Sequence, residues 1–217
     1  MIDNEKQFKQ VLEVLNNEGI LDNVILIGSW CLLLYKTIFE NFEPNIRTID
    51  VDFFIPDVKS IKEKSCLIKS FKDINYDIVH DTLTKKSTFI SPDGFELEFL
   101  TKLNRKQLTC VKVGDTNIFA ESLSYVDIFV SNYIIVNYGD LLVKVASPGS
   151  YVLQKLLINK YRSTKSEKDI ASVRHVLQYI EMSKKYKDDF VTLYISLPKK
   201  WKKIVDETAV INQIKLL

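Results

Sequence analysis

Two aspartates, Asp50 and Asp52, stand one residue apart in an apolar run from Ile49 to Ile55. The run predicts a strand, on which both carboxylates share one face at a backbone separation of roughly 7 Å. Ile49 and the other odd-numbered residues are predicted to face the core. Two adjacent carboxylates repel each other unless a cation balances them, and Mg²⁺ is often held by such a pair together with phosphates. The alternative is a solvated polar face on an edge strand.

A glycine and a serine, Gly28 and Ser29, follow a second strand-like run at 24–27 and precede an apolar helical segment at 30–39. The first N–H groups of a helix favour an anion, and glycine lets the backbone approach a phosphate closely. We therefore predict that Gly28 and Ser29 bind phosphate. The alternative makes Ser29 an ordinary helix cap and Gly28 a turn residue.

The order Gly28-Ser29, helix, Asp50-x-Asp52 resembles the nucleotidyltransferase superfamily of the DNA polymerase beta type. Many members carry a third carboxylate on a later strand. The alternating run 95–100 offers Glu96 and Glu98 on one face, and the resemblance implies Glu98 as the third acid and metal ligand, with glutamate where aspartate is commoner. The alternative is that both glutamates form the wet face of a half-exposed strand.

A downstream segment adds to this resemblance. A helix led by Ser147-Pro148 contains Lys155, and a second helix begins around Asp169. Their spacing resembles the abortive-infection toxin-like (AbiEii-type, minimal nucleotidyltransferase) branch. That branch implies that Lys155 contacts the triphosphate and that Asp169 positions the acceptor or acts as a base. The alternatives are that Lys155 snorkels to water and that Ser166-x-x-Asp169 is a capping-box variant.

Composition and the remaining motifs narrow the function class. Arg47 lies in the connection before the strand that carries Asp50 and Asp52. We expect it either to bind a phosphate or to remain a surface residue. The net charge of +2 lacks the excess of a dedicated nucleic-acid binder, and the basic run 199–203 is more typical of a solvated helix face. Scattered cysteines, no membrane-length apolar run and no signal-peptide pattern predict a reduced, cytoplasmic protein.

The pattern of elements predicts an α+β fold, with a mixed sheet and flanking helices followed by a helical C-terminal half. Residues 1–146 would form the nucleotidyltransferase-like core, and 147–217 a helical subdomain closing the nucleotide site. The first helix is expected at 5–18 and another at 61–71. Further strands are expected at 76–80, 88–91, 95–100, 116–120 and 141–145, with 131–138 ambiguous.

These inferences converge on transfer of a nucleotidyl group from a Mg²⁺-bound nucleoside triphosphate to a hydroxyl of RNA, protein or a small molecule. The toxin resemblance adds an antitoxin-type protein partner. Two alternatives stay open: a catalytically idle module that binds a nucleotide or a partner for regulation, and phosphodiester hydrolysis by a two-metal acidic site.

Overall fold

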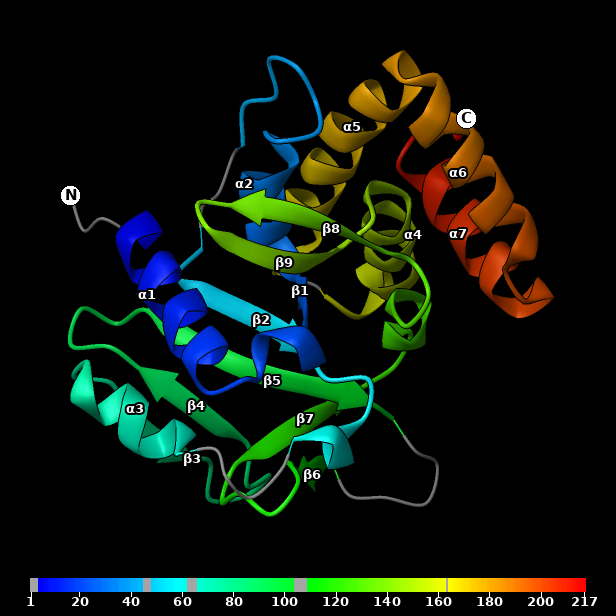
Figure 1. Cartoon of the computed structure of the whole chain (residues 1–217). Coiled ribbons are helices and arrows are strands. Elements are labelled where there is room, and N and C mark those ends of the chain that lie inside the picture. Colours follow the sequence, from blue (N-terminus) through cyan, green and yellow to red (C-terminus); the bar gives the residue numbers. More distant parts are fainter. Residues whose placement is uncertain (1–3, 45–47, 62–65, 104–108, 163) are drawn as a thin grey trace.

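The computed structural model describes residues 4–44, 48–61, 66–103, 109–162 and 164–217. One mixed sheet dominates the described part of the chain, with helices on its flanks and at one end (Figure 1). Its strands are β1 (Ile25–Ile27), β2 (Asp50–Phe54), β3 (Asp77–His80), β4 (Ser87–Ile90), β5 (Glu96–Lys102), β6 (Cys110–Lys112), β7 (Phe119–Leu123), β8 (Tyr133–Tyr138) and β9 (Leu141–Ala146).

The strand order is β3-β4-β5-β2-β1-β9-β8, and β7 pairs with the end of β5 and with β6. β2 runs antiparallel to β1 and parallel to β5, so the acidic strand lies near the middle of the sheet. The polar face of β2 is therefore not that of an edge strand, because hydrogen-bonded neighbours flank it on both sides.

Helices α1 (Asn4–Asn17) and α3 (Leu67–Asp73) cover the apolar side of the sheet (Figure 1). Phe71 of α3 lies 4.5 Å from the ring of Phe89 on β4, and Phe89 meets Phe99 of β5 edge-on. Because side chains alternate along a strand, burial of Phe99 and Leu97 on this side directs Glu96 and Glu98 to the other side.

The C-terminal helices are α4 (Pro148–Ile158), α5 (Ser166–Met182), α6 (Lys184–Ser196) and α7 (Lys199–Ile211). Ser147 caps α4 by accepting a hydrogen bond from the Ser150 amide, and Pro148 occupies its first turn, as the sequence predicts. α4 packs against each of the other three helices and is almost wholly buried. It is therefore a core element that presents its few polar side chains inward.

The predicted fold class is confirmed, and most expected elements form within a few residues of their predicted bounds. The strand expected at 116–120 forms as β7 but begins only at Phe119, because a hydrogen bond from the Val113 amide to the Ile118 carbonyl closes a turn before it. The apolar segment after Ser29 forms a shorter helix than expected, α2 (Cys31–Tyr35). Ile49, predicted to face the core, is 48% exposed because it precedes β2.

The ambiguous segment 131–138 forms β8, and Gly19 follows the first helix with a φ of +66°, as a helix-ending glycine should. The start of the helix expected at 61–71 lies partly outside the described residues. Among the described residues, no helix is both long and apolar enough to cross a membrane.

Candidate active site

Strand pairing places four carboxylates side by side. Asp50 of β2 lies opposite Glu96 of β5 in the parallel register. Asp52 lies opposite Glu98 in the same register. Directly opposed residues on paired strands project from the same face, so the sheet presents these acids as one group. The register thus brings Glu98 next to Asp52, the geometry expected for a third acid.

Gly28 lies against Asp52 at the end of β1. The register pairs Ile27 with Asp52, and Gly28 turns away with a φ of +72°. A Cβ atom built on Gly28 would lie 2.6 Å from Oδ2 of Asp52. Glycine is therefore required both by the left-handed backbone and by the closeness of the carboxylate. Gly28 and Ser29 together line a small hollow beside the two aspartates.

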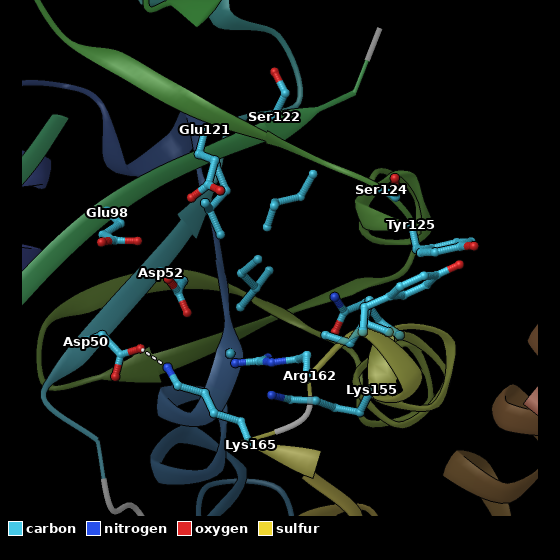
Figure 2. A pocket seen from close by; sticks show the side chains of 17 residues that line it. Asp50, Asp52, Glu98, Glu121, Ser122, Ser124, Tyr125, Lys155, Arg162 and Lys165 are labelled. Atoms are coloured by element: carbon cyan, nitrogen blue, oxygen red, sulfur yellow. Dashed lines mark hydrogen bonds and ion pairs between the residues drawn. The ribbon is translucent and has the colours of Figure 1, made fainter. Parts of the chain in front are cut away.

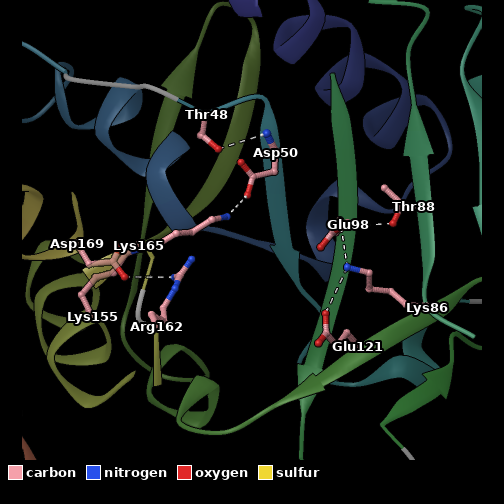
Figure 3. Close-up of polar contacts among 10 residues, drawn as sticks. All are labelled: Thr48, Asp50, Lys86, Thr88, Glu98, Glu121, Lys155, Arg162, Lys165 and Asp169. Carbon is pink, nitrogen blue, oxygen red and sulfur yellow. Dashed lines mark hydrogen bonds and ion pairs between the residues drawn. The ribbon is translucent and has the colours of Figure 1, made fainter. Parts of the chain in front are cut away.

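Helices α4 and α5, which face the acidic strands across the site, carry a buried ion pair. Nζ of Lys155 lies 2.7 Å from Oδ1 of Asp169, and the two residues are only 4% and 3% exposed. Nη1 of Arg162 lies 3.4 Å from Oδ2 of Asp169. Asp169 thus holds two cations at the edge of the site, as Figure 3 shows.

Two of the alternative interpretations from the sequence are wrong. Lys155 does not snorkel to water, because its ammonium group is buried against Asp169. Ser166 does not cap α5, because it is the first helical residue and its hydroxyl donates to Oδ1 of Asn159. Asp169 accordingly pairs with side chains from α4 and from the segment after it, rather than closing a capping box.

A third cation bridges the two walls. Nζ of Lys165 lies 3.2 Å from Oδ2 of Asp50, in an ion pair whose side chains are 51% and 29% exposed. The hollow lined by Gly28 and Ser29 is also lined by Lys155, Arg162, Lys165 and Lys168. Burial lowers the pKa of Lys168, against the opposing charge of Asp50. The hollow therefore combines a glycine-serine turn with four cations and the carboxylates of Asp50, Asp52 and Asp169.

Glu98 has its own cation on the strand side. Nζ of Lys86 lies 2.8 Å from Oε1 of Glu98 and 3.6 Å from Oε2 of Glu121. The hydroxyl of Thr88 donates to the same Glu98 oxygen at 3.3 Å. Figure 3 shows Lys86 reaching between the two glutamates. Glu98 is thus anchored away from the Lys165 side of the site.

A cavity of about 650 Å³ joins these groups. In Figure 2 the aspartates and Glu98 lie on one side, Lys155 and Arg162 project from the helical side, and Tyr125 stands at the far end. Tyr161 also lines the cavity. Its volume and mixed lining are within the range of small-molecule sites.

Charge crowding changes the acidity of Asp52. Its pKa is raised to about 7, first by removal from water and then by the negative charges of Asp50 and Glu98, while Lys155 and Arg162 act in the opposite direction. The pKa of Glu96 is also raised, first by burial and then by Glu98 and Asp50. A raised carboxyl pKa in a cleft is typical of a functional site.

The donor set suits one hard divalent ion. Asp50 and Asp52 supply carboxylate oxygens on one face, and the close approach of Gly28 leaves space that a side chain would fill. Mg²⁺ is commonly bound by one or two carboxylates, with substrate phosphates and water completing the shell. Within the described residues, no set of three or more acidic, histidine or cysteine side chains is arranged to hold a metal. Asp50 and Asp52 therefore fit such an ion as a pair.

The structure brings the sequence-predicted residues Gly28, Ser29, Asp50, Asp52, Glu98, Lys155 and Asp169 around this cavity and hollow. Arg47 lies outside the described residues. Sequence reasoning did not single out Lys86, Glu121, Tyr125, Tyr161 or Lys165 as site residues. Arg162 was not predicted as a site residue either. Lys86 and Lys165 had no local signal, since the chain holds 30 lysines and arginines.

Comparison with known families decides the classification. A nucleotidyltransferase family model matches residues 6–192. The chain belongs to the nucleotidyltransferase family. Membership implies a nucleotide substrate and an acceptor. The toxin-like branch within the wider superfamily stays a prediction, because the family match does not distinguish it.

Solved structures with detectable likeness carry related descriptions. An antigenic nucleotidyltransferase-like protein from Paracoccidioides brasiliensis is 18% identical, with 91% of this chain and 92% of that chain covered and a TM-score of 0.47. Lincosamide antibiotic adenylyltransferase LnuA is 14% identical, with 77% and 96% covered and a TM-score of 0.45. Antibiotic-resistance factor ANT(2'')-Ia is 8% identical, with 97% of each chain covered and a TM-score of 0.44. No curated protein matches the sequence significantly.

Proposed function

We propose that this protein transfers a nucleotidyl group from a Mg²⁺-bound nucleoside triphosphate to an acceptor hydroxyl. The observation that carries the proposal is the opposition of two walls across one cavity. Asp50 and Asp52 stand on the strand wall, and Lys155 and Arg162 stand on the helical wall. A metal-bound triphosphate carries a cation for the first wall and phosphate oxygens for the second.

Each residue has a distinct task in this scheme. Asp50 and Asp52 hold the ion, which when bound neutralises charge on the phosphates. Gly28 and Ser29 offer backbone and hydroxyl donors in the hollow where the cations gather. Lys165 pairs with Asp50, and its half-exposed side chain would reach a phosphate oxygen of the bound triphosphate. Arg47 stays a prediction as a further phosphate ligand.

The transfer step follows from this placement. The acceptor oxygen forms a bond to the α-phosphorus, the bond from that phosphorus to the β-phosphate oxygen breaks, and pyrophosphate leaves. Glu98 receives the acceptor proton at Oε2, since Lys86 and Thr88 both engage Oε1. Positioning and charge stabilisation supply most of the acceleration in reactions of this kind.

Asp169 acts on the cations rather than on the acceptor. Its two oxygens face Lys155 and Arg162, at 2.7 Å and 3.4 Å. A carboxylate so engaged and 3% exposed has no open path to an acceptor hydroxyl. We therefore assign it to orienting the two phosphate-binding cations, a refinement of its predicted role as acceptor ligand or base.

Among the candidate acceptors, RNA has a specific observation in its favour. Trp201, within the basic run Lys199–Lys203 at the start of α7, packs edge-on against cavity-lining Tyr125 at 5.2 Å. This places lysines beside the far end of the cavity, where they would meet phosphates of a polynucleotide. Protein and small-molecule acceptors, the toxin-like role and the antitoxin-type partner stay predictions.

The test measures thermal unfolding with each of the four ribonucleoside triphosphates, with and without Mg²⁺. A ligand that binds only the folded state raises the melting temperature. We expect a Mg²⁺-dependent rise with at least one triphosphate, and its loss in the double variant Asp50→Asn/Asp52→Asn. The control, Asp73→Asn/Asp140→Asn, makes the same chemical change at exposed positions and should keep the rise.

Activity is measured next, with the stabilising triphosphate labelled at the α-phosphate and total cellular RNA or protein as acceptor. We expect label in the acceptor fraction and release of pyrophosphate. Asp52→Asn should lower this rate by about 10³-fold or more, as loss of a group that organises transition-state charge does. Triphosphate binding without any transfer would favour the regulatory module. Nucleotide release from RNA without a triphosphate would favour hydrolysis.

A further inference from the structure

Lys86 is an internal cation of the acidic group. It precedes β4 by one residue, and its ammonium group lies 2.8 Å from Glu98 and 3.6 Å from Glu121. The side chain is 26% exposed, and that of Glu98 is 15% exposed. Burial lowers the pKa of Lys86, but the hydrogen bond and charge of Glu98, together with Glu121, outweigh this and leave the pKa raised. Lys86 is therefore firmly protonated at neutral pH.

The surroundings fix Lys86 in this position. β4 pairs antiparallel with β5, and the register sets Thr88 opposite Glu98. Thr88 donates to the same Glu98 oxygen as Lys86 does, so Oε1 has two donors from one strand edge. Ser87, next to Lys86, is fully buried, and its hydroxyl accepts a hydrogen bond from the Phe119 amide of β7. The backbone that carries Lys86 is thus tied to two neighbouring strands.

Lys165, which pairs with Asp50, is held much less firmly. It makes one ion pair, at 3.2 Å, and its side chain is 51% exposed. Surface pairs of this kind contribute little to stability and are readily exchanged. A divalent ion can therefore displace Lys165 from Asp50. Displacing Lys86 would break its ion pairs with Glu98 and Glu121 and leave its partly buried charge unpaired. That costs more free energy than breaking an exposed pair.

We propose that Lys86 is a built-in cation that keeps Glu98 out of metal coordination and limits the site to one divalent ion, held by Asp50 and Asp52. The proposal rests on the nucleotidyltransferase function proposed above. In it, the ammonium group occupies the position between Glu98 and Glu121 where a second ion would otherwise be attracted. Lys86 is a positioning residue, because it acts on the reacting groups through Glu98.

This assignment explains why the acids do not form a three-ligand site. Glu98 is adjacent to Asp52 in register, yet its Oε1 is committed to Lys86 and Thr88. In the absence of Lys86, Glu121 and Glu98, which lies next to Asp52 in register, would lose the cation that they share. Such a group attracts a hard divalent cation, and paired ions stand roughly 3.5–4 Å apart in two-metal sites.

The experiment measures free Mn²⁺ by electron paramagnetic resonance and obtains the number of bound ions by subtracting this from the total added. The protein is saturated with a triphosphate that carries a methylene bridge between its α- and β-phosphorus atoms. We expect one bound Mn²⁺ in the wild type and two in Lys86→Met, which removes the charge but keeps the length of the side chain. Lys86→Arg keeps the charge and should bind one. The control Lys112→Met removes an exposed lysine from the same sheet and should also bind one.

The outcomes separate this proposal from the proposed function. Two Mn²⁺ ions in the wild type would overturn the role of Lys86 and leave the transferase function standing. A single ion in a folded Lys86→Met protein would overturn it as well. Failure of the wild type to bind either the analogue or Mn²⁺ would overturn both. Should Lys86→Met not fold, Lys86→Gln is counted in its place, and the wild-type count alone remains decisive against the proposal.

Discussion

The strand wall and the helical wall of the cavity carry opposite charges that are stabilised in different ways. On the strand wall, backbone pairing sets Asp50, Asp52 and Glu98 side by side, and burial together with their repulsion raises the pKa of Asp52. On the helical wall, Lys155 is neutralised by Asp169 within the protein interior. One wall thus keeps a deficit of positive charge. On the other wall Lys155 and Arg162 share the single carboxylate of Asp169, which holds both cations in place without neutralising both of them.

The difference assigns separate roles to the two walls. A surface short of cations gains most from binding one, so the strand wall is where the proposed metal ion would bind. A wall whose charges are already paired is rigid before the ligand arrives, which limits the ordering needed on binding. We infer that the strand wall supplies the driving force for metal binding and that the helical wall supplies fixed geometry for the phosphates.

The largest expected effect on stability comes from removing the buried carboxylate of the helical wall. Asp169→Asn removes the negative charge beside buried Lys155 without changing the shape of the side chain. An unpaired buried charge is costly, so we expect a loss of about 3–5 kcal/mol in the free energy of unfolding, measured by urea denaturation. Adding Lys155→Met should restore a large part of it. A loss below about 1 kcal/mol would contradict a structural role for this pair.

An intermediate effect is expected from removing the carboxylate of Asp52 on the strand wall. The pKa of Asp52 is raised from 3.8 to about 7, so the folded chain retains a proton that the unfolded chain has released between these values. The free energy of unfolding should therefore fall as pH rises from about 4 to 7. Asp52→Asn carries no such proton and should flatten this slope, gaining on the order of 2 kcal/mol at pH 8.

Denaturation curves at pH 5, 6, 7 and 8 measure this effect, with Asp140→Asn as an exposed control that should retain the wild-type slope. Added Mg²⁺ sharpens the test, because it should stabilise the wild type at pH 8 and leave Asp52→Asn unchanged. Parallel pH profiles for the wild type and Asp52→Asn would show that the pKa of Asp52 is not raised in the folded protein.

The smallest effect concerns the link between the walls. Lys165→Ala should change the free energy of unfolding by less than about 0.5 kcal/mol, because its pair with Asp50 is largely exposed. It should weaken binding of the Mg²⁺-triphosphate about fivefold, as expected for one lost charge-assisted contact. Isothermal titration calorimetry measures this, with Lys215→Ala as an exposed control. Unchanged affinity would restrict Lys165 to balancing Asp50.

The strand wall was largely predictable from sequence, whereas the helical wall was only partly so. Alternation of side chains is a local property, so residues 49–55 alone set Asp50 and Asp52 on one face, and Gly28-Ser29 marks its turn without distant context. Lys155 and Asp169 were named through a resemblance, but their burial against each other depends on how α4 and α5 pack. That packing overrode both snorkelling and the capping box.

The cations that complete the site depend on contacts between distant parts of the chain. Lys165 and Asp50 are 115 positions apart, and nothing in the local sequence relates them. Lys86 pairs with Glu98 across two antiparallel strands, so its partner becomes evident only once the register is known. Lysines are abundant and versatile, and in this chain sequence alone gave no reason to prefer these two.

Position 28 offers a genetic route to the same site. Because a side chain there would meet the Asp52 carboxylate at 2.6 Å and the backbone is left-handed, even the smallest substitution disturbs the site while leaving every charge intact. Saturation mutagenesis at this single codon should consequently tolerate glycine alone. A selectable phenotype for the gene would thus reveal the catalytic region through one intolerant position, before any substrate is in hand.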